Sequence, residues 1–351
     1  MPFTGQLRSN EIFSALFNMI ISQEVFADNV KGTDLVDEAR VDGSLFGDTK
    51  LYYSTDALAS SAWGNDAEAA NLLEIARPEP PQVQSIYLDT FRQIRLTVDN
   101  YLSKRAWGDE GAFSSFTSVM LGWLRNTKKI YDGTTYNAYI GTAEGEATKS
   151  DIEVRATDAK VLAEDIANVF TEMTDYTRDF NDYKQLRRYS EDEIKIIFNS
   201  KYINKIKNVD LPVIFDNAGL KATFSKKVLP ARYFGTVNTV SKTTADAKTR
   251  ALFETTVSSG TGAGHYFPGD LLPTGTPLVS SGNIVVPSYQ EDDTIVAKIV
   301  TKLPPYMSAF EVGTSFFNPR SLTETHYLTF GHNTIVYLKA FPMITLKAAQ
   351  A

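Results

Sequence analysis

The residues best suited to catalysis or metal binding are three histidines, and their spacing suits neither task. His326 and His332 lie six residues apart, which is not the four-residue spacing of a metal pair on a helix, and His265 is remote in sequence. No acidic residue stands at ligand spacing from them. The chain contains no cysteine, which excludes disulfides, thiolate zinc sites and cysteine nucleophiles. The histidines therefore predict no metal site.

Three alternating glycines, Gly260, Gly262 and Gly264, have the composition of a glycine-rich nucleotide loop. They are followed by the residues HYFP at 265–268, where a phosphate site would need the N-terminus of a helix. A flexible turn is the preferred interpretation.

The carboxylates give no catalytic signature. Asp292 and Asp293 are adjacent and Glu191 lies near Glu193, but a chain with 42 acidic residues contains such neighbours by chance. The sequence has no Gly-x-Ser-x-Gly elbow, no Walker A motif and no His-Glu-x-x-His pair. We assign no catalytic, cofactor-binding or metal-ligating residue and expect no cofactor. A hydrolase using dispersed carboxylates is the least favoured alternative.

Basic residues occur only in short groups. The groups are Lys128 and Lys129, Arg187 and Arg188, Lys205 and Lys207, and Lys226 and Lys227. They could face nucleic acid or the acidic edges of neighbouring subunits, but surface salt bridges are the preferred interpretation. The net charge of -7 and the pI near 5.2 argue against a surface that mainly binds phosphate, so nucleic acid would be contacted loosely.

The bulk composition predicts a soluble protein with a large core. The chain has 351 residues, 43% of them hydrophobic, which is enough for two or three domains. Its N-terminus lacks the basic and apolar blocks of a signal peptide. The longest apolar run, 16–21, is far shorter than the roughly 20 residues of a membrane span. We expect no membrane partner.

The first hundred residues predict parts that need a partner. Apolar positions over 9–27 recur at helical spacing, and this helix either packs on its own core or lies across a neighbouring subunit. Two stretches within 41–106, GSLFGDTKLYYSTDAL and IYLDTFRQIRLTVDNYL, alternate like long strands. We expect them to form an extended hairpin around a proline cluster at 78–81, with too little core of its own.

A long helix is the strongest local prediction. Apolar residues recur every three or four positions from Ala112 to about Tyr139, which corresponds to a helix on the order of 40 Å long. A second amphipathic helix is predicted near 159–180, capped by Thr157 or Asp158. Its apolar face would carry Leu162, Ile166, Val169, Phe170, Met173, Tyr176 and Phe180. Ser190 and Glu193 have capping-box spacing and mark a short helix or a helix-to-strand junction.

The last third of the chain is predicted to be β-rich. Residues 236–290 are rich in Thr, Ser and Gly, which indicates a loop-rich or flexible insertion. The following stretches, TIVAKIVTKLPPYMSAFEVGTSFF and HYLTFGHNTIVYLKAFPMITLK, are β-like, and we expect them to pack beside the long helix.

The order of these parts resembles the major capsid proteins of tailed bacteriophages with the HK97-like fold. The resemblance rests on FRQIRLTVDNYLSKRAW leading into AFSSFTSVMLGWLRNTKKIYD, and on IFNSKYINKIKNVDLPVIFDNAGLKATF. It implies an α+β protein with an N-terminal arm, an extended hairpin called the E-loop, a spine helix in a peripheral domain, and an α/β axial domain. The implied ranges are 1–40 for the arm, 41–106 for the E-loop, 107–144 for the spine helix, 145–299 for the axial domain and 300–351 for the return strands.

The same resemblance implies a structural, non-enzymatic function. Copies would self-assemble as hexamers and pentamers, in the host cytoplasm, into the icosahedral virion head. The implied partners are a portal protein, scaffolding or decoration proteins, and packaged double-stranded DNA contacted non-specifically. Some family members crosslink a lysine to an asparagine, but Lys50 and Lys104 match only by location, so we assign no crosslink. The alternative function is a tail or adhesion protein that binds a carbohydrate receptor through its 17 tyrosines and 3 tryptophans.

Overall fold

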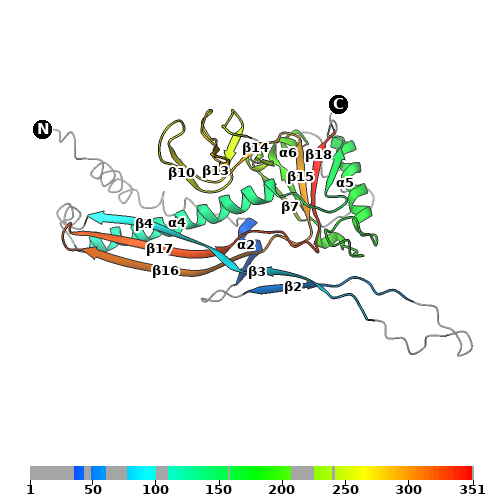
Figure 1. The fold of residues 1–351 in the computed structure, drawn as a ribbon, viewed down its shortest axis with the longest axis horizontal. Helices are drawn as coiled ribbons and strands as arrows, with labels where there is room; N and C mark the ends of the chain where they lie inside the picture. The colour runs from blue at the N-terminus through cyan, green and yellow to red at the C-terminus, as the bar shows by residue number, and fades with distance from the viewer. Residues whose placement is uncertain are drawn as a thin grey trace, which may run out of the picture. The chain divides into compact units, whose positions relative to one another are not determined.

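The computed structural model describes two compact units. The described residues are 35–42, 49–60, 77–99, 110–156, 159–206, 225–238 and 242–349, so the helix predicted over 9–27 lies outside them. Unit 1 comprises Met1–Gly47, Leu88–Thr134 and Met307–Asn333. Unit 2 comprises Asp48–Tyr87, Thr135–Tyr306 and Thr334–Ala351. Each unit is described by itself below (Figure 1).

Unit 1 is built on a four-stranded sheet. Its strand order is β1 (Arg40–Asp42), β16 (Tyr306–Asn318), β17 (Thr323–Asn333) and β4 (Leu88–Asp99). The pairs β16–β17 and β17–β4 are antiparallel. The short helix α2 (Leu35–Ala39) precedes β1 and buries Leu35, Val36 and Ala39.

The predicted alternation of β4 is confirmed. Val98 is buried and Ile94 and Leu96 are half-buried, whereas Arg95 and Thr97 are exposed. Ile94 and Leu96 pack against a cluster of four buried side chains, which are Leu124, Tyr131, Leu328 and Phe330. One face of the sheet therefore packs on the long helix.

The predicted pairing of β4 is wrong. The strands of the two alternating stretches do not pair with each other: in the described part of the first stretch, β2 (Lys50–Ser54) pairs with β3 (Gln82–Ile86), while β4 pairs with β17. The reason is burial. In register with β17, the apolar face of β4 joins Leu328 and Phe330 beneath the helix, a cover that β2 does not offer.

The predicted long helix is α4, Glu110–Thr142, slightly longer than expected. Leu124 and Tyr131 are buried, whereas Trp123 and Ile130, which the spacing placed on the same apolar face, are exposed. Near the C-terminal end, α4 passes very close to the backbone of the 3₁₀ helix η2 (Ala231–Tyr233). A Cβ added to Gly141 would lie 2.0 Å from the Tyr233 carbonyl oxygen, so only glycine fits there.

Unit 2 is built on a five-stranded sheet. The order is β5 (Asp151–Val154), β18 (Met343–Ala348), β15 (Ile295–Val300), β6 (Lys195–Asn199) and β7 (Ser225–Leu229). The outer pairs β5–β18 and β6–β7 are parallel, and β15 is antiparallel to both of its neighbours. All six residues of β15 are buried, as expected for a central strand covered on both faces.

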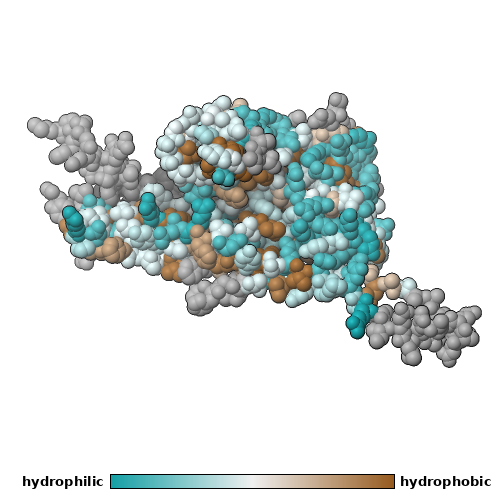
Figure 2. All heavy atoms as spheres, viewed as in Figure 1, coloured by the Kyte–Doolittle hydropathy of each residue, from teal (hydrophilic) through white to brown (hydrophobic). Residues whose placement is uncertain are grey.

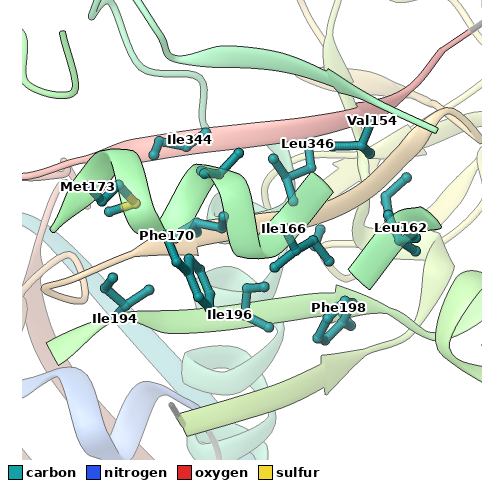
Figure 3. Packing of buried hydrophobic residues seen from close by; sticks show 14 of the residues in the cluster. Val154, Leu162, Ile166, Phe170, Met173, Ile194, Ile196, Phe198, Ile344 and Leu346 are labelled. Carbon is teal, nitrogen blue, oxygen red and sulfur yellow. The ribbon is translucent and has the colours of Figure 1, made fainter. Parts of the chain in front are cut away.

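Helix α5 (Ala159–Met173) packs its apolar side on this sheet (Figure 3). The predicted residues Leu162, Ile166, Phe170 and Met173 all lie in that core. The helix ends at Met173, earlier than predicted. Seven residues on, Phe180 is buried in the same core.

The predicted capping box is not formed. Ser190 precedes the 3₁₀ helix η1 (Glu191–Glu193), but its side chain makes no capping hydrogen bond, and the chain continues directly into β6. The helix-to-strand junction is therefore the correct alternative. Helix α6 (Ser200–Ile206) follows β6.

The region predicted to be a loop-rich insertion instead has seven short strands among its described residues. β8 (Gly235–Val237), β14 (Ser288–Glu291) and β9 (Thr249–Ala251) form a sheet in that order. β10 (Thr255–Val257) pairs with β11 (Gly264–Tyr266), and β12 (Val279–Ser280) with β13 (Asn283–Ile284). A small core of five buried residues holds them together: Ala245, Ala251, Leu272, Leu278 and Val286.

A buried lysine lies in the middle of the five-stranded sheet. The Lys298 ammonium donates hydrogen bonds to the carbonyl oxygen of Ala143 (2.7 Å) and to Thr345 Oγ1 (2.8 Å). Ala143 directly follows α4, so the charge sits at the negative end of that helix. Burial lowers the pKa of Lys298 to about 8.

Three of the expected domain ranges, 41–106, 107–144 and 300–351, are divided between the units. Residues 300–351 were expected to return together beside the long helix, but β18 pairs with β15 and β5 in unit 2. Residues 41–106 divide after Gly47 and again after Tyr87, and residues 107–144 divide after Thr134. Within the described ranges, no helix is both long and apolar enough to cross a membrane.

Candidate functional site

The histidines do not form a site. His326 and His332 both lie on β17 in unit 1, and His265 lies on β11 in unit 2. His332 Nδ1 donates to the Asn333 carbonyl (2.8 Å), so its Nε2 accepts from the Tyr131 hydroxyl (2.7 Å), and burial lowers its pKa. His332 is thus a neutral structural residue. Among the described residues, no three His, Asp or Glu side chains are grouped as metal ligands.

The glycine cluster is a hairpin loop. Gly260 and Gly262 have φ of +86° and +79° in the connection between β10 and β11, and Gly264 begins β11. The Tyr266 hydroxyl donates to the Gly262 carbonyl (2.8 Å) and folds the loop back on its own strand. A strand, not a helix, follows the glycines, so the phosphate-binding geometry is absent.

Asp293 and Lys128, from two of the charged pairs, have structural partners. The Asp293 carboxylate accepts hydrogen bonds from the ammonium groups of Lys248 (2.5 Å) and Lys201 (2.9 Å), and these bonds lower the pKa of Asp293. Lys128 was expected on the surface but is buried, and its ammonium lies 2.9 Å from Asp132. The side chains of Lys205, Lys207 and Lys226 lie outside the described residues.

The feature with the character of a binding site is the β2–β3 hairpin. Its inner face carries Tyr52 and Gln84, which lie opposite each other in the ladder. Its outer face carries Leu51, Tyr53 and Val83, which are 50%, 64% and 49% exposed. Figure 2 shows hydrophobic atoms along this hairpin. A two-stranded ribbon with three uncovered apolar side chains is not a stable structure by itself.

Gln84 holds the inner face to the rest of unit 2 at the middle of the ladder. The Gln84 amide donates from Nε2 to the Tyr337 carbonyl (2.9 Å) and accepts at Oε1 from the Lys339 N–H (3.0 Å). The Gln84 side chain thus satisfies one carbonyl and one N–H group of the backbone segment that follows β17. Tyr337 is itself fixed, because its N–H donates to the Tyr139 hydroxyl (2.7 Å) on α4.

A cation holds Tyr52, the partner of Gln84 in the same ladder pair. The Lys302 ammonium lies over the ring of Tyr52 (5.4 Å to the centroid) and over the ring of Phe341 (5.3 Å). Such contacts stabilise by roughly 0.5–1 kcal/mol at exposed sites. Tyr52 is thereby kept on the inner face.

A polar cluster holds the hairpin where its ladder ends. Arg187 Nη2 donates to Ser54 Oγ (2.9 Å) and to the Thr55 carbonyl (3.0 Å). The Asp56 carboxylate accepts from Arg178 (2.5 Å) and from the N–H groups of Leu186 and Ala57 (both 2.8 Å). The hydrogen bond from Arg178 is the main cause that lowers the pKa of Asp56 to about 2.

The sequence contains little that could have revealed these anchors. Gln84 lies more than 250 residues from its partners, and Asp56 lies 130 from Leu186. Neither residue stands in a motif. The one usable signal was the alternation in KLYYS, which places Leu51 and Tyr53 on one face.

Comparison with known proteins gives one family and one fold. A family model described as Phi29-like phage major capsid protein matches residues 5–345. A chain in the capsid structure of Staphylococcus phage Andhra is 12% identical, with a TM-score of 0.64, over 93% of this chain and 87% of that chain. A chain in the structure of head fiber and inner core protein gp22 of native bacteriophage P68 is 11% identical, with a TM-score of 0.56, over 92% and 88%. No curated protein sequence matches.

Proposed function

The chain belongs to the family of Phi29-like phage major capsid proteins, and from this premise we propose that its copies form hexamers and pentamers around packaged double-stranded DNA. It is a structural, non-enzymatic protein of the virion head, with the mixed α+β fold of HK97-like phage capsid proteins. Capsid proteins of this kind assemble into icosahedral shells.

In the proposed shell, the β2–β3 hairpin acts as the E-loop. Its apolar outer face is covered by a neighbouring copy, which gives it the core that it lacks alone. Unit 1, with the first part of α4, acts as the peripheral domain, and the five-stranded sheet with α5 acts as the axial domain. The observation that carries this proposal is the contrast between the anchored inner face and the exposed Leu51, Tyr53 and Val83.

The long helix offers a second surface for a neighbour. Trp123 and Ile130 lie seven residues apart on α4 and are exposed at 48% and 41%. Seven residues are close to two helical turns, so both side chains point to the same side. Burial of apolar area stabilises by roughly 25 cal/mol per Å², and an icosahedral shell repeats each such contact in every copy.

Further partners follow from the resemblance. We expect a portal protein and scaffolding or decoration proteins at the head. Because the net charge is -7, the packaged DNA is contacted loosely and without sequence specificity.

Electron microscopy of the purified chain tests the function. We expect capsomers or closed shells in negatively stained images. Rods, rings or trimers would support the tail or adhesion alternative, and a monomer at all concentrations would contradict assembly by this chain alone.

The double substitution Tyr53→Glu and Val83→Glu should block assembly. Each side chain loses roughly 1.5–3 kcal/mol of burial against a neighbour, so the concentration needed for assembly should rise at least about a hundredfold. Both side chains are exposed in the single chain, so its thermal midpoint should stay close to that of the wild type. Light scattering against concentration measures the first effect, and calorimetry of the unassembled chain the second.

The control is the pair Tyr53→Phe and Val83→Ile, which keeps the outer face apolar and should assemble normally. Normal assembly of the glutamate variant would show that this face is not an interface.

A further inference from the structure

The polar cluster around Asp56 occupies a particular place on the hairpin. The last ladder pair is Ser54 with Gln82, and Asp56 lies two residues beyond it. Residues 55–60 and 77–81, which continue from the two strands, are all exposed. Asp56 is therefore held at the point where the chain leaves the body of unit 2.

The two partners of Asp56 that are distant in sequence, Arg178 and Leu186, belong to one closed loop, residues 177–187. Thr177 and Arg187 pair across its base with N–H···O distances of 3.0 Å in both directions. Inside the loop, the buried Asn181 accepts from the Gln185 N–H and donates to its carbonyl, both at 2.8 Å. Arg178 Nη1, the nitrogen that binds Asp56, also donates to the Lys184 carbonyl (2.7 Å), so the loop itself holds this nitrogen in place. The loop is thus formed independently of the hairpin.

Asp56 fits this loop with directional contacts. One carboxylate oxygen accepts the N–H groups of Leu186 and Ala57, and the other accepts Arg178. Three donors around one carboxylate fix its orientation as well as its position, and bonds to a charged acceptor are stronger than neutral ones. Arg187 also donates a hydrogen bond to the Thr55 carbonyl, so the loop holds two consecutive residues, Thr55 and Asp56.

We propose that Asp56 is the positioning residue of the hairpin: its contacts with the 177–187 loop set the direction in which the chain leaves unit 2 before a neighbouring copy is bound. This inference rests on the assembly function proposed above. A hairpin that already points toward the neighbour loses less conformational freedom on binding, which favours capture. The low pKa of Asp56 keeps the carboxylate charged, and the contacts formed, at every pH well above 2.

The chain offers a closely matched control, Asp175. Asp175 and Asp56 each accept the N–H group of the next residue, at 2.7 Å and 2.8 Å. Only Asp56 also binds Arg178 and Leu186. Asp56→Ala and Asp175→Ala therefore remove the same charge and the same local hydrogen bond, but only the first removes contacts with the 177–187 loop.

The direction of the hairpin can be measured without assembly. Because the chain has no cysteine, the substitutions Leu58→Cys and Asn168→Cys allow one spin label beside the hairpin and one on α5. Pulsed electron paramagnetic resonance then measures the distribution of distances between the two labels. We expect a narrow distribution in the parent chain, broadened by Asp56→Ala but not by Asp175→Ala. The Leu186 amide should exchange with solvent at least about tenfold faster in the Asp56→Ala variant. An equally narrow distribution in the Asp56→Ala variant would overturn the proposal.

Assembly provides the second measurement. The rate of shell formation should fall about tenfold with Asp56→Ala and less with Asp56→Asn, which keeps one acceptor oxygen, while the thermal midpoint stays nearly constant. A residue with a merely structural role would lower the midpoint instead. A broadened distribution with an unchanged assembly rate would also overturn the proposal. If the wild-type chain forms no shells, the assembly function fails, and the label distances still decide whether Asp56 sets the direction.

Discussion

Replacing Gly141 by alanine should lower the free energy of unfolding by about 3 kcal/mol, although alanine favours helices. The added Cβ would lie 2.0 Å from the Tyr233 carbonyl oxygen and 2.6 Å from its carbonyl carbon. Both atoms belong to the backbone, so no side-chain rotation can relieve the overlap. Either α4 or the η2 segment must move, at the expense of the packing around both.

Gly122 in the same helix is the control. A Cβ added there meets no described atom within 4 Å. Gly122→Ala should therefore raise the free energy of unfolding by up to about 1 kcal/mol, since only helix propensity changes. Denaturant titration of both variants measures the contrast. A stabilising Gly141→Ala would show that α4 and η2 do not approach each other as described.

The second large effect is a dependence of stability on pH that comes from Lys298. Its pKa is about 8 in the folded chain, against 10.5 for a free lysine. Between these values the unfolded chain binds more protons than the folded one, so the contribution of Lys298 to the free energy of unfolding rises with pH. The burial penalty is fully present below pH 8 and relieved by pH 10.5. The difference of about 2.5 pKa units corresponds to roughly 3 kcal/mol.

Comparison with Lys298→Met isolates this contribution. The unfolding free energy of the wild type minus that of the variant should be flat below pH 8 and should rise toward pH 10.5. Thr345→Val removes a hydrogen-bond partner but keeps the buried lysine, so the rise should persist there. A flat difference across the whole range would mean that Lys298 reaches solvent in the folded chain.

The elements with long periodic patterns were predictable from sequence. The α4 helix was placed within a few residues, and the apolar side of α5 was identified by Leu162, Ile166 and Met173. Periodicity indicates which side of an element is buried, but not which element covers it. The β4 strand illustrates the limit, because its faces were right and its partner was wrong.

The insertion was misjudged for a different reason. Its strands have two to four residues, too short for an alternating pattern to stand out against Thr, Ser and Gly. Its core of five small and medium apolar residues is dispersed over 42 positions, from 245 to 286. No local window contains enough of them to indicate a folded region.

The hairpin site was half predictable. An incomplete core was expected for the ribbon, and the exposure of Leu51, Tyr53 and Val83 is consistent with it. Its anchors were not predictable, because Asp56, Gln84 and Lys302 act through partners distant in sequence. The Lys298 charge, in contrast, had a visible signal: a single lysine within the apolar run IVAKIV of a central strand.

The two ends of the insertion lie next to each other. Gly235, the first residue of β8, is paired with Glu291, the last residue of β14, so the chain enters and leaves the insertion at neighbouring positions of one ladder. A segment with neighbouring ends and its own core can be exchanged, shortened or replaced while the five-stranded sheet keeps its connectivity. Changes of length should therefore be tolerated more readily at this point, and a foreign peptide inserted between β10 and β11 would be present once per copy.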